Sequence, residues 1–132
     1  MNAKASIAVA AGILRDDLGQ VLVARRPEGT DQAGWWEFPG GKILPEETPL
    51  EGLVRELQEE LGVTVRSASP LLTYEHEYPE KVVKLHVWQI TDYVGQPSGV
   101  EGQPLRWLPV ADLLDEGLLP ADRPIVDRLL QS

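Results

Sequence analysis

The residues whose spacing most clearly predicts chemistry are three glutamates within the run 55–60, namely Glu56, Glu59 and Glu60. On a helix turning about 100° per residue, these three side chains share one face. Carboxylates this close repel one another, and in the second half of a helix they also oppose its dipole. A divalent cation would offset this repulsion, and Mg²⁺ binds carboxylate oxygens together with substrate phosphates. The alternative interpretation is a solvated acidic helix face, which is common in proteins.

The helix that must position these glutamates has clear end signals. Thr48 is a favourable N-cap, Pro49 suits the first helical position, and Glu51 completes a capping box. Gly62 is typical of a helix C-terminus. An apolar stripe recurs at helical spacing between these ends and consists of Leu50, Leu53, Val54, Leu57 and Leu61. We therefore expect a helix whose acidic face adjoins an apolar stripe.

Strands are expected on both sides of this helix. Before it, the pattern predicts strands at 5–14, 20–26 and 35–38, the first two joined as a hairpin and the third ended by Pro39-Gly40-Gly41. After it, we expect strands at 63–78, 81–93 and 105–108, a brief helix at 110–114 and a closing helix at 125–130. This order indicates a mixed α/β (α+β) chain rather than a regular alternation of strands and helices.

Composition restricts the class of protein. The 132 residues are 42% hydrophobic and 25% charged, which is typical of one globular domain spanning 1–132. The absence of cysteine excludes disulfides and a thiolate zinc site. A net charge of -9 disfavours binding to a nucleic acid polymer. With no long apolar run and no signal-peptide layout, we expect a cytoplasmic protein, monomeric or weakly dimeric, that does not bind membranes.

The acidic helix and the loop before it follow a longer pattern. From residue 41 to 63 the sequence reads G-x5-E-x7-R-E-U-x-E-E-x-G-U, where U is apolar. This resembles the Nudix box and matches it at every defined position. The resemblance implies a Nudix fold, with a mixed β-sheet in an α/β/α sandwich. It also implies a hydrolase that cleaves nucleoside diphosphates linked to another group, using Mg²⁺ or Mn²⁺.

The resemblance implies a role for each polar position of the box. Glu56, Glu59 and Glu60 match the metal ligands, and the Gly40 carbonyl is a further candidate ligand. Glu47 and Arg55 match a pair that holds the loop and the helix together.

Further segments, 24–26, 36–42, 101–104 and 120–124, resemble the MutT branch of the family. MutT-type enzymes hydrolyse nucleoside triphosphates to the monophosphate and pyrophosphate and prefer oxidised guanine nucleotides. By this match Arg26 would contact phosphate and Glu101 would be an additional carboxylate near the metals. Phe38 and Tyr78 would line the base pocket, and Asp122 would read the base edge. The general base stays open between Glu56, a second box glutamate and Glu101.

Asp122 departs from this pattern, because enzymes tuned for oxidised guanine often carry asparagine there. An ionised aspartate only accepts hydrogen bonds, so it would oppose the O6 acceptor of guanine and would suit the amino group of cytosine. A protonated aspartate in an apolar pocket would serve oxidised guanine. Residues 31–34 also resemble relatives that prefer pyrimidine triphosphates. The alternatives are therefore a CTP- or dCTP-type pyrophosphohydrolase and a non-catalytic nucleotide sensor, although sensors usually lack box carboxylates.

Overall fold

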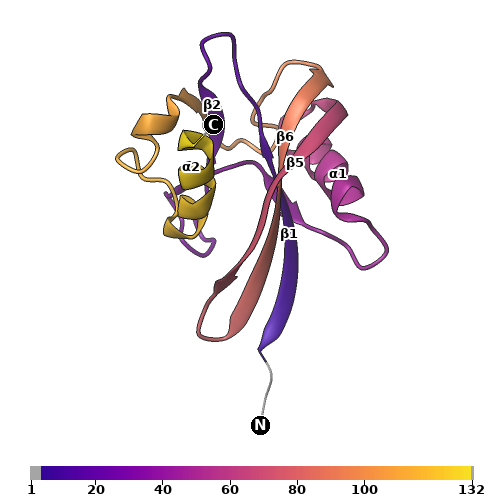
Figure 1. The fold of residues 1–132 in the computed structure, drawn as a ribbon, viewed down its shortest axis with the longest axis vertical. Coiled ribbons are helices and arrows are strands. Elements are labelled where there is room, and N and C mark those ends of the chain that lie inside the picture. Colours follow the sequence, from indigo (N-terminus) through magenta and orange to yellow (C-terminus); the bar gives the residue numbers. More distant parts are fainter. Residues whose placement is uncertain (1–3, 132) are drawn as a thin grey trace.

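The computed structural model describes residues 4–131. Its strands are β1 (Ala5–Ile13), β2 (Val21–Arg25), β3 (Trp36–Glu37), β4 (Gly40–Lys42), β5 (Thr64–Glu77), β6 (Lys81–Val94) and β7 (Leu105–Leu108). Its helices are α1 (Pro49–Leu61) and α2 (Arg123–Leu130), with short 3-10 turns at Val110–Asp112 and Pro120–Asp122 (Figure 1). No helix in the described part of the chain is both long and apolar enough to cross a membrane.

The strands form two sheets. The larger sheet has the order β4-β1-β6-β5 and is mixed, because β1 and β6 run parallel while the other pairs are antiparallel. The smaller sheet, β3-β2-β7, is antiparallel.

The expected hairpin between the first two strands is confirmed only next to its turn. There Arg15 and Val21 form an antiparallel bridge, the Asp16 amide donates to the Gln20 carbonyl, and the Leu22 amide donates to the Leu14 carbonyl. Beyond the turn, β1 and β2 belong to different sheets. Both edges of β1 are already occupied, one by β6 and the other by β4. The strand at Trp36–Glu37 does end before Pro39, as expected, but Gly40 and Gly41 then begin a further strand, β4.

Helix α1 follows its sequence signals closely. The Thr48 side chain accepts from the Glu51 amide, and the Glu51 side chain accepts from the Thr48 amide, so the expected capping box is confirmed. Gly62 ends the helix with φ 71°, in the left-handed region that glycine adopts readily. Leu50 lies outside the predicted apolar stripe, because it is 40% exposed in the first turn.

The two helices cover opposite faces of the sheet layer. Buried residues of β1 alternate between the faces: Ala10 packs with Leu53 and Leu57 of α1, while Ile13 packs with Ile125 of α2. This arrangement confirms the expected α/β/α sandwich.

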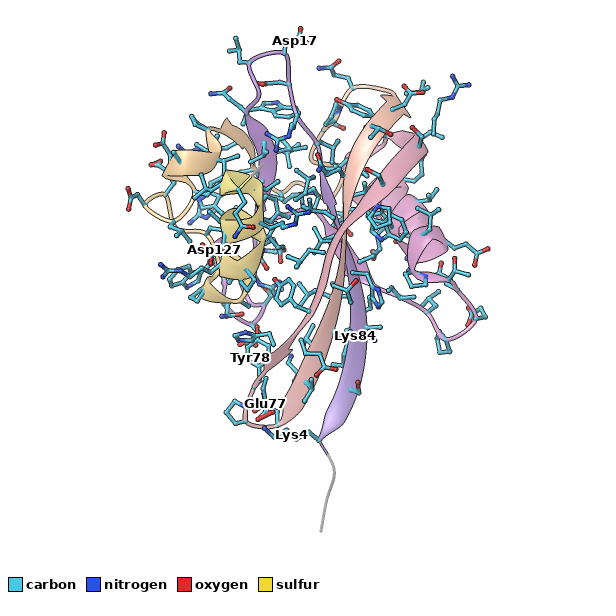
Figure 2. All side chains as sticks on the ribbon, in the orientation of Figure 1. Lys4, Asp17, Glu77, Tyr78, Lys84 and Asp127 are labelled. Atoms are coloured by element: carbon cyan, nitrogen blue, oxygen red, sulfur yellow. The ribbon has the colours of Figure 1, made fainter. Side chains whose placement is uncertain are left out.

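The β5–β6 hairpin and the start of β1 extend beyond the helices (Figure 1). The Lys4 ammonium lies 2.8 Å from the Glu77 carboxylate and ties the start of β1 to the tip of the hairpin. Tyr78 lies at that tip (Figure 2). The β5–β6 hairpin and the start of β1 therefore form a projecting part of the larger sheet.

Candidate active site

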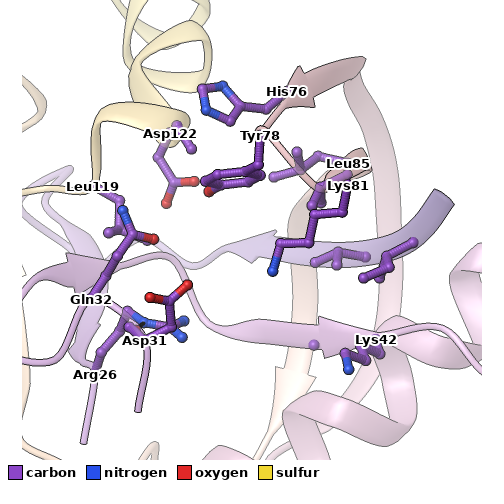
Figure 3. A pocket seen from close by; sticks show the side chains of 15 residues that line it. Arg26, Asp31, Gln32, Lys42, His76, Tyr78, Lys81, Leu85, Leu119 and Asp122 are labelled. Carbon is purple, nitrogen blue, oxygen red and sulfur yellow. Dashed lines mark hydrogen bonds between the residues drawn. The ribbon is translucent and has the colours of Figure 1, made fainter. Parts of the chain in front are cut away.

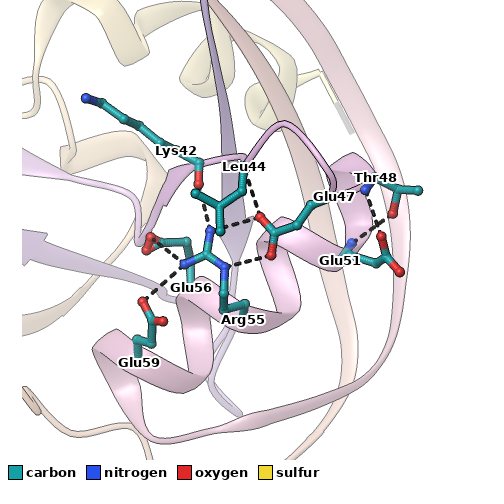
Figure 4. A network of polar contacts seen from close by, with 8 residues as sticks. All are labelled: Lys42, Leu44, Glu47, Thr48, Glu51, Arg55, Glu56 and Glu59. Atoms are coloured by element: carbon teal, nitrogen blue, oxygen red, sulfur yellow. Dashed lines mark hydrogen bonds and ion pairs between the residues drawn. The ribbon is translucent and has the colours of Figure 1, made fainter.

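Arg55 joins helix α1 to the loop that precedes it. Its Nε donates to Glu47 Oε2 at 2.7 Å, and its Nη2 donates to Glu47 Oε1 at 3.0 Å and to the Lys42 carbonyl at 2.8 Å (Figure 4). The Arg55 hydrogen bond, followed by one from the Leu44 amide, lowers the pKa of Glu47. Arg55 also donates through Nη1 to Glu59 at 3.2 Å. Residues Arg55 and Glu47 thus hold the loop and the helix together, where the box pattern pairs them.

The Glu56 carboxylate is packed against Gly41 of β4. A Cβ atom at Gly41 would collide with this carboxylate, so any larger residue there would displace the Glu56 side chain. Burial raises the pKa of Glu56, and the neighbouring Glu59 and Glu101 raise it further, although Arg55 opposes them. Glu56 is therefore a carboxylate held close to the β4 backbone among other acidic groups.

Glu60 reaches the same strand. Its Oε2 accepts from the Gly40 amide at 2.8 Å. Burial raises the pKa of Glu60 to about 8 despite this bond, and the nearby Glu37, Glu56 and Glu101 contribute in the same direction. The acidic face of α1 is thus directed at β4, where repulsion between carboxylates is only partly relieved.

The remaining acidic candidates lie at the edge of this cluster. Glu59 is more exposed and pairs with Arg55. Glu101 lies in the loop after β6, where the Gln103 amide nitrogen donates to the Glu60 carbonyl at 2.9 Å and fixes the loop beside the end of α1. In the described part of the chain, no three Asp, Glu or His side chains are placed to hold a metal ion.

A cavity of about 250 Å³ opens beside the box (Figure 3). Its apolar wall is formed by Ile7, Val9, Val83, Leu85, Leu119 and Ala121. Its polar lining is formed by Arg26, Asp31, Gln32, Lys42, His76, Tyr78, Lys81 and Asp122. Gly41 also lines it, so the strand that contacts Glu56 forms part of the cavity wall.

Arg26 lines this cavity and binds Glu37, one of the acidic groups that influence Glu60. Its Nη1 donates to Glu37 Oε1 at 2.8 Å, and its Nε donates to the Asp31 carbonyl at 2.7 Å. Burial raises the pKa of Glu37, and Arg26 opposes that shift. Glu37, which sequence reasoning missed, therefore faces a cation and stands close enough to influence both Glu60 and Asp122.

Asp122 is the only buried charged residue in the described part of the chain, at 6% exposure. Its Oδ2 accepts from the Phe38 amide at 3.4 Å. Burial raises the pKa of Asp122 to about 7, and Glu37 adds to this shift, while the Phe38 amide and Arg26 oppose it. A carboxyl with this pKa exchanges its proton near neutrality, so it can both donate and accept hydrogen bonds there.

The two aromatic candidates have different environments. The Phe38 side chain is 4% exposed and packs in the core with α2 residues instead of lining the cavity, and its contact with a base stays a prediction. Only its backbone amide reaches the Asp122 carboxyl. Tyr78 does line the cavity, with the His76 ring edge-on at 4.7 Å and the Lys81 ammonium 5.2 Å from its ring centre.

Sequence reasoning assigned no individual role to several polar residues of the cavity, namely Asp31, Gln32, Lys42, His76 and Lys81. The alternation of His76 with Tyr78 along one strand is a local signal for a shared face. For Gln32 the sequence signal was the resemblance of residues 31–34 to pyrimidine-preferring relatives, and its place in the cavity depends on how the loop at 27–35 folds.

A NUDIX domain family model matches residues 9–128. The chain is 38% identical over 124 residues to CTP pyrophosphohydrolase from Escherichia coli (strain K12), covering 94% of this chain and 91% of that protein. It is 40% identical over 130 residues to 8-oxo-dGTP diphosphatase from Haemophilus influenzae, covering 98% and 95% respectively. The crystal structure of a MutT protein from Methanosarcina mazei Go1 superposes with a TM-score of 0.88 at 28% identity, covering 99% and 97%. The chain therefore belongs to the Nudix family and is a MutT-like hydrolase of pyrophosphate bonds.

Proposed function

We propose that this protein is a divalent-metal-dependent nucleoside triphosphate pyrophosphohydrolase that releases a nucleoside monophosphate and pyrophosphate. The observation that carries the proposal is the shared β4 strand, which contacts the box carboxylates and also lines the cavity. A nucleobase in the cavity would place its phosphates toward the acidic face of α1. In this proposal residues 1–132 act as one domain, as a monomer or weak dimer, on free nucleotides in the cytoplasm.

The carboxylates near β4 are the type of ligand that a hard cation such as Mg²⁺ or Mn²⁺ prefers, although no three described side chains converge on one point in this structure. Glu56, Glu59, Glu60 and Glu101 supply carboxylate oxygens, and burial and mutual repulsion raise the pKa of Glu56 and Glu60. The Gly40 amide points at Glu60, and in an antiparallel ladder the amide and carbonyl of one residue point the same way. The Gly40 carbonyl is therefore a fifth candidate ligand. When bound, the cation would neutralise phosphate charge and acidify water.

Two substrates are supported, and the protonation state of Asp122 determines which of their bases it can bind. Relatives are named 8-oxo-dGTP diphosphatase and CTP pyrophosphohydrolase. With its pKa near 7, a protonated Asp122 can donate to the O6 of oxidised guanine, and an ionised Asp122 can accept from the amino group of cytosine. We propose 8-oxo-dGTP as the main substrate and a cytosine nucleoside triphosphate as the second.

Replacing Asp122 with Asn is expected to raise the preference for 8-oxo-dGTP over dCTP about tenfold, because a mismatched buried hydrogen bond costs ~1–3 kcal/mol. The preference for 8-oxo-dGTP over unmodified dGTP should also rise. The measurement is kcat/KM on 8-oxo-dGTP, dGTP and dCTP for both proteins. Equal changes in all three constants would show that Asp122 does not read the base.

The same pair of proteins gives a pH test. Between pH 6 and 8 the ionised fraction of a group with pKa about 7 rises from about 0.1 to about 0.9. The charged and titratable groups around Asp122 are Glu37, Arg26, Tyr74 and Tyr78. In the native protein the ratio of dCTP to 8-oxo-dGTP activity should therefore rise with pH. In Asp122→Asn this ratio should not change with pH. An equal rise of the ratio in both proteins would show that a group other than Asp122 titrates.

A further inference from the structure

Gln32 has an unusual backbone conformation. It is the only non-glycine residue with positive φ, at 58°, in the described part of the chain. Side chains other than those of Asn and Asp rarely adopt this left-handed region, and such residues cluster at functional sites. Two contacts hold the loop in this form: Arg26 Nε donates to the Asp31 carbonyl, and the Trp35 amide donates to the Gln32 carbonyl at 3.3 Å.

This conformation brings the Gln32 side chain into the cavity. Gln32 is half-buried and lines the cavity together with Asp122 and Tyr78. Figure 3 shows its amide extending from the loop toward the part of the cavity where the Asp122 carboxyl lies. The amide has no hydrogen-bond partner among the described residues. A half-buried amide with free donors and a free acceptor is suited to a polar group of a ligand.

Gln32 supplies what Asp122 lacks. An ionised Asp122 only accepts hydrogen bonds, and the Phe38 amide already donates to it. The Arg26 guanidinium is bound to Glu37 and to the Asp31 carbonyl. The Gln32 NH₂ group is a neutral donor that lines the same cavity. An acceptor and a donor in one cavity can together complement a base edge that carries a donor next to an acceptor.

We infer that Gln32 is a second specificity-determining residue, which donates to N3 of an aminopyrimidine while Asp122 accepts from the exocyclic amino group. This inference rests on the proposed function and assigns a second residue that reads its cytosine substrate. Uracil presents the opposite order, with an acceptor at O4 and a donor at N3, so the pair selects against it. Cytosine nucleoside triphosphates are therefore hydrolysed in preference to uracil nucleoside triphosphates.

Gln32→Met keeps the length of the side chain and removes its hydrogen bonds. We expect kcat/KM on dCTP to fall about tenfold, the effect of one hydrogen bond in a half-buried site. Hydrolysis of an abasic deoxyribose 5′-triphosphate should not change, because that compound has no base to read. Gln89→Met is the matched control, since Gln89 is a half-buried glutamine on β6 that does not line the cavity.

A double variant tests the donor–acceptor order itself. Gln32→Glu with Asp122→Asn places the acceptor where the donor was and a donor where the acceptor was. The ratio of dCTP to dUTP activity, above one in the native protein, should shift toward dUTP by at least about tenfold. Gln32→Gly distinguishes a role in base recognition from a role in folding, because glycine adopts the left-handed conformation freely. This variant should keep the native Tm and still lose activity on dCTP.

A ratio of dCTP to abasic triphosphate activity in Gln32→Met within twofold of the native value would overturn the inference. So would an unchanged dCTP to dUTP ratio in the double variant. These outcomes leave the proposed function standing as long as the native protein hydrolyses nucleoside triphosphates to the monophosphate. A folded native protein that hydrolyses none of them would instead refute the proposed function.

Discussion

Glu60→Gln is expected to lower kcat at least ~100-fold while the protein stays folded, and Glu59→Gln is expected to do the same. Both residues belong to the acidic face that is proposed to bind the cation, and loss of a charged ligand weakens cation binding and stabilisation of the transition state. The amide oxygen of a glutamine at position 60 can still accept from the Gly40 amide, so the link between α1 and β4 is kept. Steady-state rates and circular dichroism on each variant provide the measurement.

Glu46→Gln is the matched control for these substitutions. Glu46 is exposed in the loop before α1, and its replacement removes the same unit of charge. Among the described residues, no hydrogen bond or ion pair joins Glu46 to Glu56, Glu59 or Glu60. Its kcat should stay within twofold of the native value. Near-native turnover of Glu60→Gln or Glu59→Gln at saturating Mg²⁺ would mean that the residue replaced is not a required ligand.

Removal of divalent cations is expected to abolish hydrolysis. The triphosphate and the acidic cluster, which contains Glu56, Glu60 and Glu101, are both anionic, so a substrate would be repelled without a bridging cation. Chelator treatment followed by titration with Mg²⁺ or Mn²⁺ should restore turnover in proportion to occupancy. The activity measurement therefore shows which cation the reaction requires.

The same titration has a readout that needs no substrate. A ligand that binds only the folded state stabilises it by ~2.7 kcal/mol at about 100 times its Kd, so Mg²⁺ should raise Tm. The rise should be smaller in Glu60→Gln, which lacks one carboxylate, than in the Glu46→Gln control. Chelator-resistant hydrolysis would contradict the proposed mechanism whatever the Tm measurement gave.

Helix α1 could be predicted from sequence because its signals are local. The Thr48–Glu51 capping box and the stop at Gly62 act within a few residues and do not depend on the rest of the fold. The contacts of Arg55 with Glu47 are also nearly local, since the loop between them is short. The exposure of Leu50 was not predictable in this way, because it depends on how far the sheet extends under the first turn.

Strand pairing could not be predicted because it depends on distant segments. The turn at 16–19 favours a hairpin, yet β1 pairs with β6, which starts about 70 residues later, and with β4. Pro39-Gly40-Gly41 has the composition of a turn, but the Ala10 carbonyl lies so close to Gly40 that no Cβ would fit there. Glycine is thus required in β4 for the same close backbone approach that the strand pairing creates.

The cavity was the least predictable part of the site. Arg26, Tyr78 and Asp122 come from three distant segments, and only the resemblance to the MutT branch brought them together in advance. The Phe38 side chain points into the core because neighbouring strand positions face opposite ways and Glu37 faces Arg26. Gln32 enters the cavity through a backbone conformation that its residue type does not favour.

Hydrolysis of dCTP and 8-oxo-dGTP in H₂¹⁸O, with mass spectrometry of the products, tests the proposed reaction. Water attack at the β-phosphorus, as the resemblance to the MutT branch implies, would give an unlabelled nucleoside monophosphate and pyrophosphate that carries the label. Label in the monophosphate would show that water attacks the α-phosphorus instead. Release of a nucleoside diphosphate and orthophosphate would contradict the proposal that this Nudix hydrolase is a nucleoside triphosphate pyrophosphohydrolase.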